Sequence, residues 1–191
     1  MLIWMCALRC EAKPVIDFFR LKKSNQHKTY DTYLNEQNIC IVSGIGSQNM
    51  ASAVNWSQKQ FPQSDIGWIN IGIAGHKSLD TGKVITAESV TSESEDGIFV
   101  LPEVIDNPFQ SMPVRSRCKA CFDYAEDTAF DMEAYAFIDS TTHYSNINRC
   151  SVIKVISDNQ WVPATRNKAK ISQLIEQNMP AIGQIAQNLL I

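Results

Sequence analysis

The stretch Ala129-Phe130-Asp131-Met132-Glu133-Ala134-Tyr135-Ala136-Phe137 joins a short strand-like segment to an alanine-rich apolar segment typical of a buried helix. Two carboxylates, Asp131 and Glu133, stand at the junction. Burying a carboxylate is costly unless hydrogen-bond donors face it. Such donors are available at the N-terminus of a helix or in a polar ligand. The stretch therefore predicts either a helix cap with one solvated glutamate, or a ligand site at a strand-to-helix turn.

Composition narrows the class of protein. The chain has 191 residues, 45% of them hydrophobic and 19% charged, which suits one globular domain spanning 1–191. A net charge of −3 argues against a nucleic-acid partner. No apolar run approaches the roughly 18 residues of a membrane span, and the first residues lack a basic leader. We expect a cytoplasmic protein with no membrane partner.

The six cysteines are mostly interpreted as packing residues. Cys6, Cys40 and Cys150 lie in apolar runs, where a free cysteine behaves as a small hydrophobe. Cys118-Lys119-Ala120-Cys121 is a single C-x-x-C motif without a second pair or a nearby histidine, so no metal site is predicted. Basic neighbours such as Arg117 would favour a reactive thiolate, which leaves a thiol redox role as an alternative.

Apolar runs at 2–8, 38–42, 66–75 and 150–156 predict strands buried on both faces, and 83–91 alternates like a strand. Residues 27–35 predict a further strand that forms a hairpin with 38–42 around Glu36-Gln37. Residues 92 to about 122 contain three prolines and predict a long irregular connection. The pattern as a whole predicts a single α/β domain.

Helices are expected between these strands. One follows Arg9, with Pro14 in its first turns, and one follows Ser47, with an apolar face at helical spacing. A last helix is expected from about Thr165, with Pro180 as a kink or break.

Polar or small residues follow several of the predicted strands: Glu11, Gly46, Gly75, Glu133 and Asp158. In open α/β sheets the strand ends converge on one ligand-binding crevice. Three carboxylates there, with few cations beyond Lys154, indicate acid–base chemistry on a polyhydroxylated or heterocyclic ligand rather than phosphate anchoring.

The order and spacing of short motifs resemble the purine nucleoside phosphorylase / uridine phosphorylase superfamily, most closely its methylthioadenosine/S-adenosylhomocysteine nucleosidase branch. The resemblance implies a mixed, partly barrel-like central sheet flanked by helices, and assembly as a homodimer. It covers Met1 to about Asp158. The motifs are Ala7-Leu8-Arg9-Cys10-Glu11, Ser43-Gly44-Ile45-Gly46, Gly72-Ile73-Ala74-Gly75, Asp131-Met132-Glu133-Ala134 and Ile156-Ser157-Asp158.

The resemblance also implies roles in cleaving the bond between a ribose and a base. Asp158 would be the acid that protonates the purine N7, and would have to hold a proton near neutral pH. Glu133 would bind the ribose hydroxyls, and Glu11 would position and deprotonate the attacking water. Further substrate contacts would come from Ser157, which orients Asp158, from Met132 against the sugar, and from Ile45, Ala74, Gly75 and Lys154.

Two positions depart from the family pattern. The nucleosidases carry a serine at the position of Ile73 and an arginine at that of Lys154, and both normally help to hold the nucleophile. We expect a nucleosidase that uses water on a small-molecule nucleoside and needs no cofactor. A phosphorylase, with inorganic phosphate as co-substrate, and a nucleoside-binding protein without turnover are the alternatives.

Two further assignments stay open in the sequence. His76 is expected as an exposed loop residue, with a place beside the catalytic groups as the alternative. The base-stacking aromatic residue is one of Phe109, Phe122, Tyr124 and Trp161.

Overall fold

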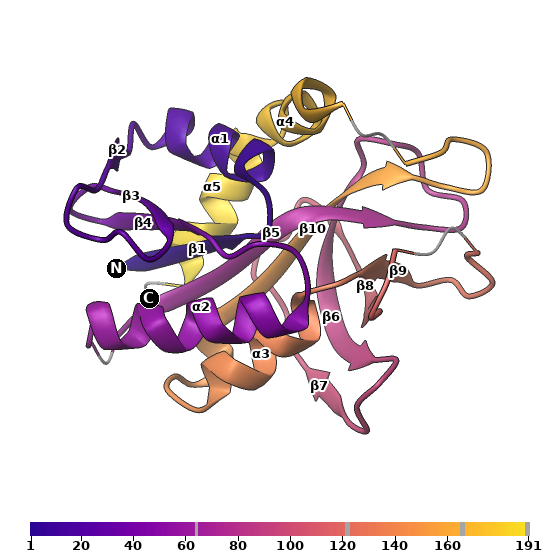
Figure 1. The fold of residues 1–191 in the computed structure, drawn as a ribbon. Coiled ribbons are helices and arrows are strands. Elements are labelled where there is room, and N and C mark those ends of the chain that lie inside the picture. The colour runs from indigo at the N-terminus through magenta and orange to yellow at the C-terminus, as the bar shows by residue number, and fades with distance from the viewer. Residues whose placement is uncertain (64, 121–122, 165–166, 190–191) are drawn as a thin grey trace.

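The computed structural model describes residues 1–63, 65–120, 123–164 and 167–189. These residues form one ten-stranded mixed sheet with helices on both faces (Figure 1). The strands are β1 (Leu2–Cys6), β2 (Lys22–Lys23), β3 (Asp31–Leu34), β4 (Asn38–Val42), β5 (Gly67–Gly75), β6 (Val84–Ser92), β7 (Ile98–Val100), β8 (Gln110–Ser116), β9 (Ala129–Asp131) and β10 (Cys150–Asp158).

Part of the sheet closes into a ring. β5 pairs with β10 in parallel, and β10 pairs with β6 antiparallel. β6 then pairs with β8, β8 with β9, and β9 returns to β5. On the other side of β5, the sheet continues as an open arm through β1, β4, β3 and β2. The predicted mixed, partly barrel-like α/β fold is confirmed.

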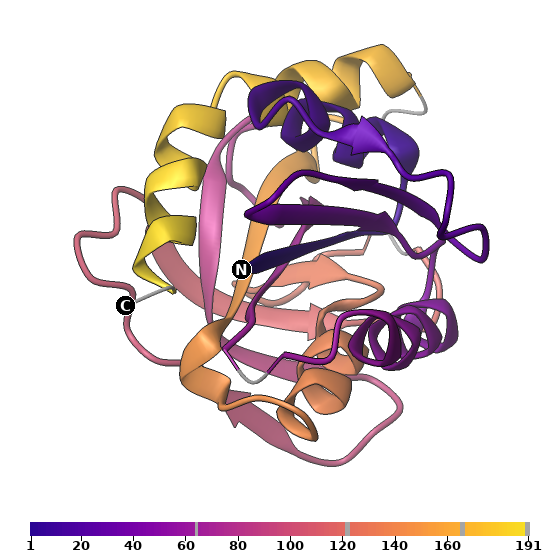
Figure 2. The same cartoon turned by 90° about the vertical axis from the view of Figure 1, so that its left-hand side faces the viewer.

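The helices cover the two faces separately (Figures 1 and 2). One face carries α2 (Ser47–Gln60) and α3 (Ala134–Thr142); the other carries α1 (Arg9–Phe18), α4 (Lys168–Glu176) and α5 (Met179–Asn188). Strands β1, β5 and β10 contribute alternate side chains to both cores, so they are apolar almost throughout. No helix among the described residues is long and apolar enough to cross a membrane.

The prediction of a long irregular connection at 92–122 is wrong, because this region contains β7 and β8. Met112, Val114 and Ser116 are buried on alternate positions of β8. The strand was not predicted because it contains Pro113, and proline is rare inside strands. Pro113 lies in β8 where the pairing with β6 shifts register between Ala87 and Ser89, and irregular ladders are where strands tolerate proline.

The predicted hairpin is confirmed as β3 and β4, which pair antiparallel. The predicted break in the last helix is confirmed, since two helices, α4 and α5, meet at Asn178. Pro180 lies in the first turn of α5, where the absence of its amide proton costs no helical hydrogen bond. Thr165, the expected start of the helix, lies outside the described residues.

Candidate active site

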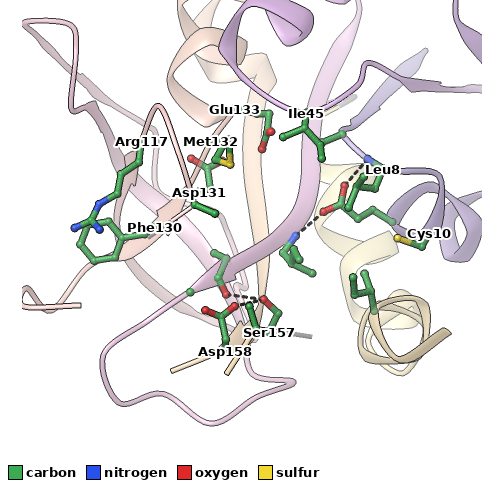
Figure 3. A pocket seen from close by; sticks show the side chains of 18 of the residues that line it. Leu8, Cys10, Ile45, Arg117, Phe130, Asp131, Met132, Glu133, Ser157 and Asp158 are labelled. Atoms are coloured by element: carbon green, nitrogen blue, oxygen red, sulfur yellow. Dashed lines mark hydrogen bonds between the residues drawn. The ribbon is translucent and has the colours of Figure 1, made fainter. Parts of the chain in front are cut away.

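A cavity of about 400 Å³ opens where β1, β5 and β10 end and β9 leads into α3 (Figure 3). Glu11, Glu133 and Asp158 all line it, although they lie on α1, at the start of α3 and at the end of β10. Their residues are only 3%, 7% and 4% exposed. The fold therefore brings the three predicted carboxylates, each largely buried, to one cavity.

Both carboxylate oxygens of Glu11 accept backbone hydrogen bonds. Oε2 accepts from the amide of Leu8 at 2.8 Å, and Oε1 accepts from the amide of Ile73 at 3.0 Å. Burial raises the pKa of Glu11, while the Ile73 amide and the charge of Lys154 oppose the rise. Glu11 is therefore held in one orientation and has a higher proton affinity than an ordinary glutamate.

Glycine at position 72 is required for this arrangement. A Cβ atom added to Gly72 would lie 2.9 Å from Oε1 of Glu11, closer than such atoms approach in proteins. The backbone of β5 thus approaches the carboxylate directly, because Gly72 has no side chain.

Glu133 stands at the N-terminus of α3, and its Oε1 accepts a hydrogen bond from the amide of Gly46 at 2.6 Å. Gly46 has a φ of 96°, a conformation that favours glycine. Burial, together with the nearby charge of Asp131, raises the pKa of Glu133 to about 7. At neutral pH this group therefore exists in both protonation states.

Asp158 receives two hydroxyl groups. Ser157 Oγ donates to Oδ1 at 2.5 Å, and the phenol hydroxyl of Tyr124 donates to Oδ2. Ser157 Oγ also lies 3.4 Å from the carbonyl oxygen of Ala74, which ties the end of β10 to β5. The carboxyl group consequently has a fixed orientation at the end of the cavity opposite Glu133 (Figure 3).

Asp131 and Lys154 form a buried ion pair with Nζ and Oδ2 2.7 Å apart. Nζ also donates to Oδ1 of Asn70 at 2.7 Å, and Oδ2 of Asp131 accepts from the Ala134 amide at 2.8 Å. Burial alone would lower the pKa of Lys154, but the surrounding carboxylates outweigh it and raise the pKa. Asp131 thus accepts from the first turn of α3, with Lys154 as its counterion, whereas the alternative of a helix cap with a solvated glutamate is wrong, because Glu133 is buried.

The structure also places the remaining predicted site residues. Lys154 is not among the described residues that line the cavity, although its charge acts on Glu11 and Glu133. The other predicted substrate contacts do line it: Ile45, Ala74, Gly75, Met132 and Ser157.

Cations around the cavity are more numerous than the sequence indicated. Arg117, Lys119 and Lys168 line it. The Arg117 guanidinium lies 3.9 Å from the centre of the Phe130 ring, a cation–π contact at the wall of the cavity. Phe130 and Arg117 were not predicted as site residues from the sequence. The signal available was the basic run from Arg115 to Lys119, which we interpreted only as the surroundings of a thiol.

Of the four aromatic candidates, Tyr124 lines the cavity. Trp161 is 67% exposed, Phe109 packs against the core that α1, α4 and α5 cover, and Phe122 lies outside the described residues. Cys121 also lies outside them, so the C-x-x-C motif cannot be placed as a pair. Within the described part of the chain, no cluster of three or more His, Cys, Asp or Glu residues is arranged to hold a metal ion.

His76 differs from its prediction as an exposed loop residue. Its side chain is 1% exposed, and Nδ1 accepts hydrogen bonds from the amides of Ser78 and Leu79 at 3.1 and 3.0 Å. Burial lowers the pKa of His76, with Asp127 opposing. The residue organises the turn after β5, since a neutral ring nitrogen is needed to accept these two bonds.

Comparison with solved structures assigns the architecture to the nucleoside phosphorylase-like fold. The similar structures include 5'-methylthioadenosine/S-adenosylhomocysteine nucleosidases. The Arabidopsis thaliana 5'-methylthioadenosine nucleosidase in its apo form has a TM-score of 0.79 and 12% identity, over 98% of this chain and 95% of that one.

Two of the similar structures contain 5'-methylthioadenosine or adenine. A mutant of the Helicobacter pylori nucleosidase with 5'-methylthioadenosine in the active site has a TM-score of 0.76 and 10% identity, over 97% of each chain. The Colwellia psychrerythraea nucleosidase in complex with adenine has a TM-score of 0.72 and 14% identity, over 99% of this chain and 93% of that one. No protein-family model matches the sequence, and neither does any curated protein. At these identities the comparison establishes the fold.

Proposed function

We propose that this protein hydrolyses the N-glycosidic bond of a purine nucleoside or a related ribosyl compound. The observation that carries the proposal is the convergence of Glu11, Glu133 and Asp158 on one buried cavity. The fold supports it, because proteins of the same fold bind 5'-methylthioadenosine and adenine. The cavity volume lies within the range of small-molecule sites.

In the proposed reaction, different residues stabilise the negative charge that develops on the base and the positive charge that develops on the sugar. The bonding electrons leave with the base, and Asp158 transfers a proton to a base nitrogen, so that a neutral base departs. Ionised Glu133 accepts hydrogen bonds from the ribose hydroxyls and stabilises the positive charge on the sugar ring. Glu11 takes a proton from water as the water oxygen bonds to the anomeric carbon.

The raised pKa of Glu11 fits the role of base, since a carboxylate of higher proton affinity takes a proton from water more readily. Met132 and Ile45 line the cavity beside Glu133, and we place them against the sugar (Figure 3). Ala74 and Gly75 offer backbone groups to the base or sugar. Lys154 acts on substrate only through the charges of the carboxylates.

A test is incubation with adenosine, 5'-methylthioadenosine, inosine, guanosine and uridine, with and without inorganic phosphate, followed by chromatography of free base. We expect base release from a purine nucleoside without phosphate. Release that requires phosphate would indicate a phosphorylase instead, an alternative that the cations Lys119 and Lys168 at the cavity favour. Nucleosides that raise the melting temperature without any base release would indicate a binding protein.

The roles are tested by substitution. Asp158→Asn should lower the turnover number by about a hundredfold or more, the usual contribution of a general acid. Asp139→Asn, on an exposed position of α3, is the matched control and should leave turnover unchanged. Wild-type turnover in Asp158→Asn would remove the residue from this role.

We also propose a homodimer in the cytoplasm. Sedimentation velocity of the purified chain tests the assembly, and a single species of monomer mass at micromolar concentration would contradict it.

A further inference from the structure

The segment from Asp123 to Thr128 brings Tyr124 to the Asp158 end of the cavity and is held by several contacts. The guanidinium of Arg117 donates to the carbonyl oxygen of Asp123 at 3.2 Å. Arg115 pairs with Glu126 at 3.0 Å, and Nε2 of His76 lies 3.1 Å from Asp127. These contacts place Tyr124 within the cavity, where the residue is only 7% exposed.

Tyr124 packs between the aromatic wall and β5. Its ring stacks on Phe130 with centroids 5.6 Å apart and an interplanar angle of 22°. Its hydroxyl meets Gly75, where an added Cβ atom would overlap the phenol oxygen and ring. The absence of a side chain at Gly75 therefore provides the space in which the hydroxyl reaches Asp158.

The Tyr124 hydroxyl forms a hydrogen bond with one of the two carboxyl oxygens of Asp158. Ser157 donates to Oδ1, and Tyr124 donates to Oδ2. Ser157 neighbours Asp158 on β10, so its bond depends on the strand itself. Tyr124 comes from a separate segment 34 positions away, so its bond can break without disturbing the strand. Oδ2 is thus the oxygen that an incoming leaving group can reach.

We propose that Tyr124 is a specificity-determining residue of the leaving-group site. Its hydroxyl forms a hydrogen bond with Asp158 Oδ2, the atom to which a nitrogen of the base binds. The base can therefore bind only when the Tyr124 hydroxyl is displaced. This inference rests on the proposed function, because it assigns the leaving group to Asp158. Displacing Tyr124 costs its hydrogen bond to Asp158, and only a base that forms a new hydrogen bond to this carboxyl group offsets that cost. The site therefore discriminates between bases by the position of the nitrogen that reaches Asp158.

The test is titration calorimetry with adenine as the probe. In Tyr124→Phe the ring stays available for stacking on Phe130 while the competing hydroxyl is removed. Adenine should bind about tenfold more tightly than to the wild type, since the hydrogen bond between the phenol and the carboxyl group of Asp158 no longer has to be broken. Tyr124→Leu also lacks the hydroxyl and should shift affinity in the same direction. Tyr144→Phe is the matched control, because it removes a hydroxyl that bonds Asn55 outside the cavity.

Unchanged or weaker adenine binding in folded Tyr124→Phe would overturn the inference. A lower melting temperature with an unchanged dissociation constant would do the same, because that result describes a purely structural residue. Should neither variant fold, amide exchange of 123–127 in the wild type decides: adenine should increase it, and unchanged exchange contradicts the displacement.

The inference and the proposed function fail separately. Adenine binding that strengthens in Tyr124→Phe, with no base released from any nucleoside by the wild type, supports the role of Tyr124 and contradicts catalysis. Base release by the wild type with no gain of adenine affinity in Tyr124→Phe contradicts only the inference.

Discussion

The backbone amide of Gly46 lies 2.6 Å from Oε1 of Glu133, although 87 positions separate the two residues in the sequence. This bond joins the turn that starts α2 to the turn that starts α3. The two helices pack side by side on one face of the sheet (Figure 2). The buried carboxyl group of Glu133 therefore belongs both to the packing of the two helices and to the cavity. Its ionisation affects the stability of the fold as well as the chemistry of the site.

The first prediction concerns the pH dependence of stability. The pKa of Glu133 rises from 4.5 to about 7 on folding, so ionisation is less favourable in the folded state. The free energy of unfolding should fall as pH rises from 4.5 to about 7, because the folded protein retains a proton that the unfolded chain has released.

Glu133→Gln should abolish this loss. Its free energy of unfolding in urea at pH 8 should exceed that of the wild type by up to about 3 kcal/mol, and the difference should disappear towards pH 4.5. Glu36→Gln, at an exposed turn, is the control for removing a carboxylate. An equal difference at pH 4.5 and pH 8 would contradict the assignment of the shift to Glu133.

The second prediction concerns the close approach of β5 to Glu11. Gly72→Ala should displace the Glu11 carboxylate from the Ile73 amide, because the new methyl group would lie 2.9 Å from Oε1. Base release should slow on the order of a hundredfold, as expected when a reacting group is misplaced by about 1 Å. The readout is turnover of the best nucleoside substrate.

A matched glycine tests whether this effect is local. Gly183→Ala, in α5 and outside the cavity, should leave turnover unchanged, since the added Cβ meets only the ring edges of Phe18 and Phe19. Equal turnover in Gly72→Ala and the wild type would mean that Glu11 need not be held by Ile73.

The third prediction concerns the buried ion pair. Lys154→Met removes the counterion of Asp131 and leaves a carboxylate in a site that is closed to water. The free energy of unfolding should fall by about 3–5 kcal/mol, measured by urea denaturation at pH 7.

Lys13→Met is the comparison for Lys154→Met. Lys13 pairs with Asp17 on the exposed side of α1, and its loss should leave stability nearly unchanged. Similar stabilities for the two variants would show that the Lys154 pair does not support the folded state.

The sequence predicted the strands best where they are buried on both faces, because a continuous apolar run is required there. β1, β5 and β10 follow this rule, and the ends of these strands located Glu11, Gly75 and Asp158. β8 escaped prediction because Pro113 breaks the pattern at an irregular point of the ladder. The division between α4 and α5 was predicted as a kink or break at Pro180, but it lies just before that residue, because Pro180 is in the first turn of α5.

The contacts made across the fold could not be predicted in the same way. The pairing of Asp131 with Lys154 and of Tyr124 with Asp158 depends on how distant strands are arranged, and neither pair has a characteristic spacing. The sequence named Tyr124 only as one of four aromatic candidates. It identified which residue types meet at the cavity, but not which hydrogen bonds each would make.

The position of β10 between β5 and β6 has a consequence for biosynthesis. Strands β5 and β6 are synthesised long before residues 150–158 leave the ribosome. The edges of β5 and β6 that pair with β10 are therefore unpaired throughout that interval. An unpaired strand edge is a template for association with other chains. Nascent chains halted before residue 150 should therefore be the most prone to aggregate, and they also lack Asp158.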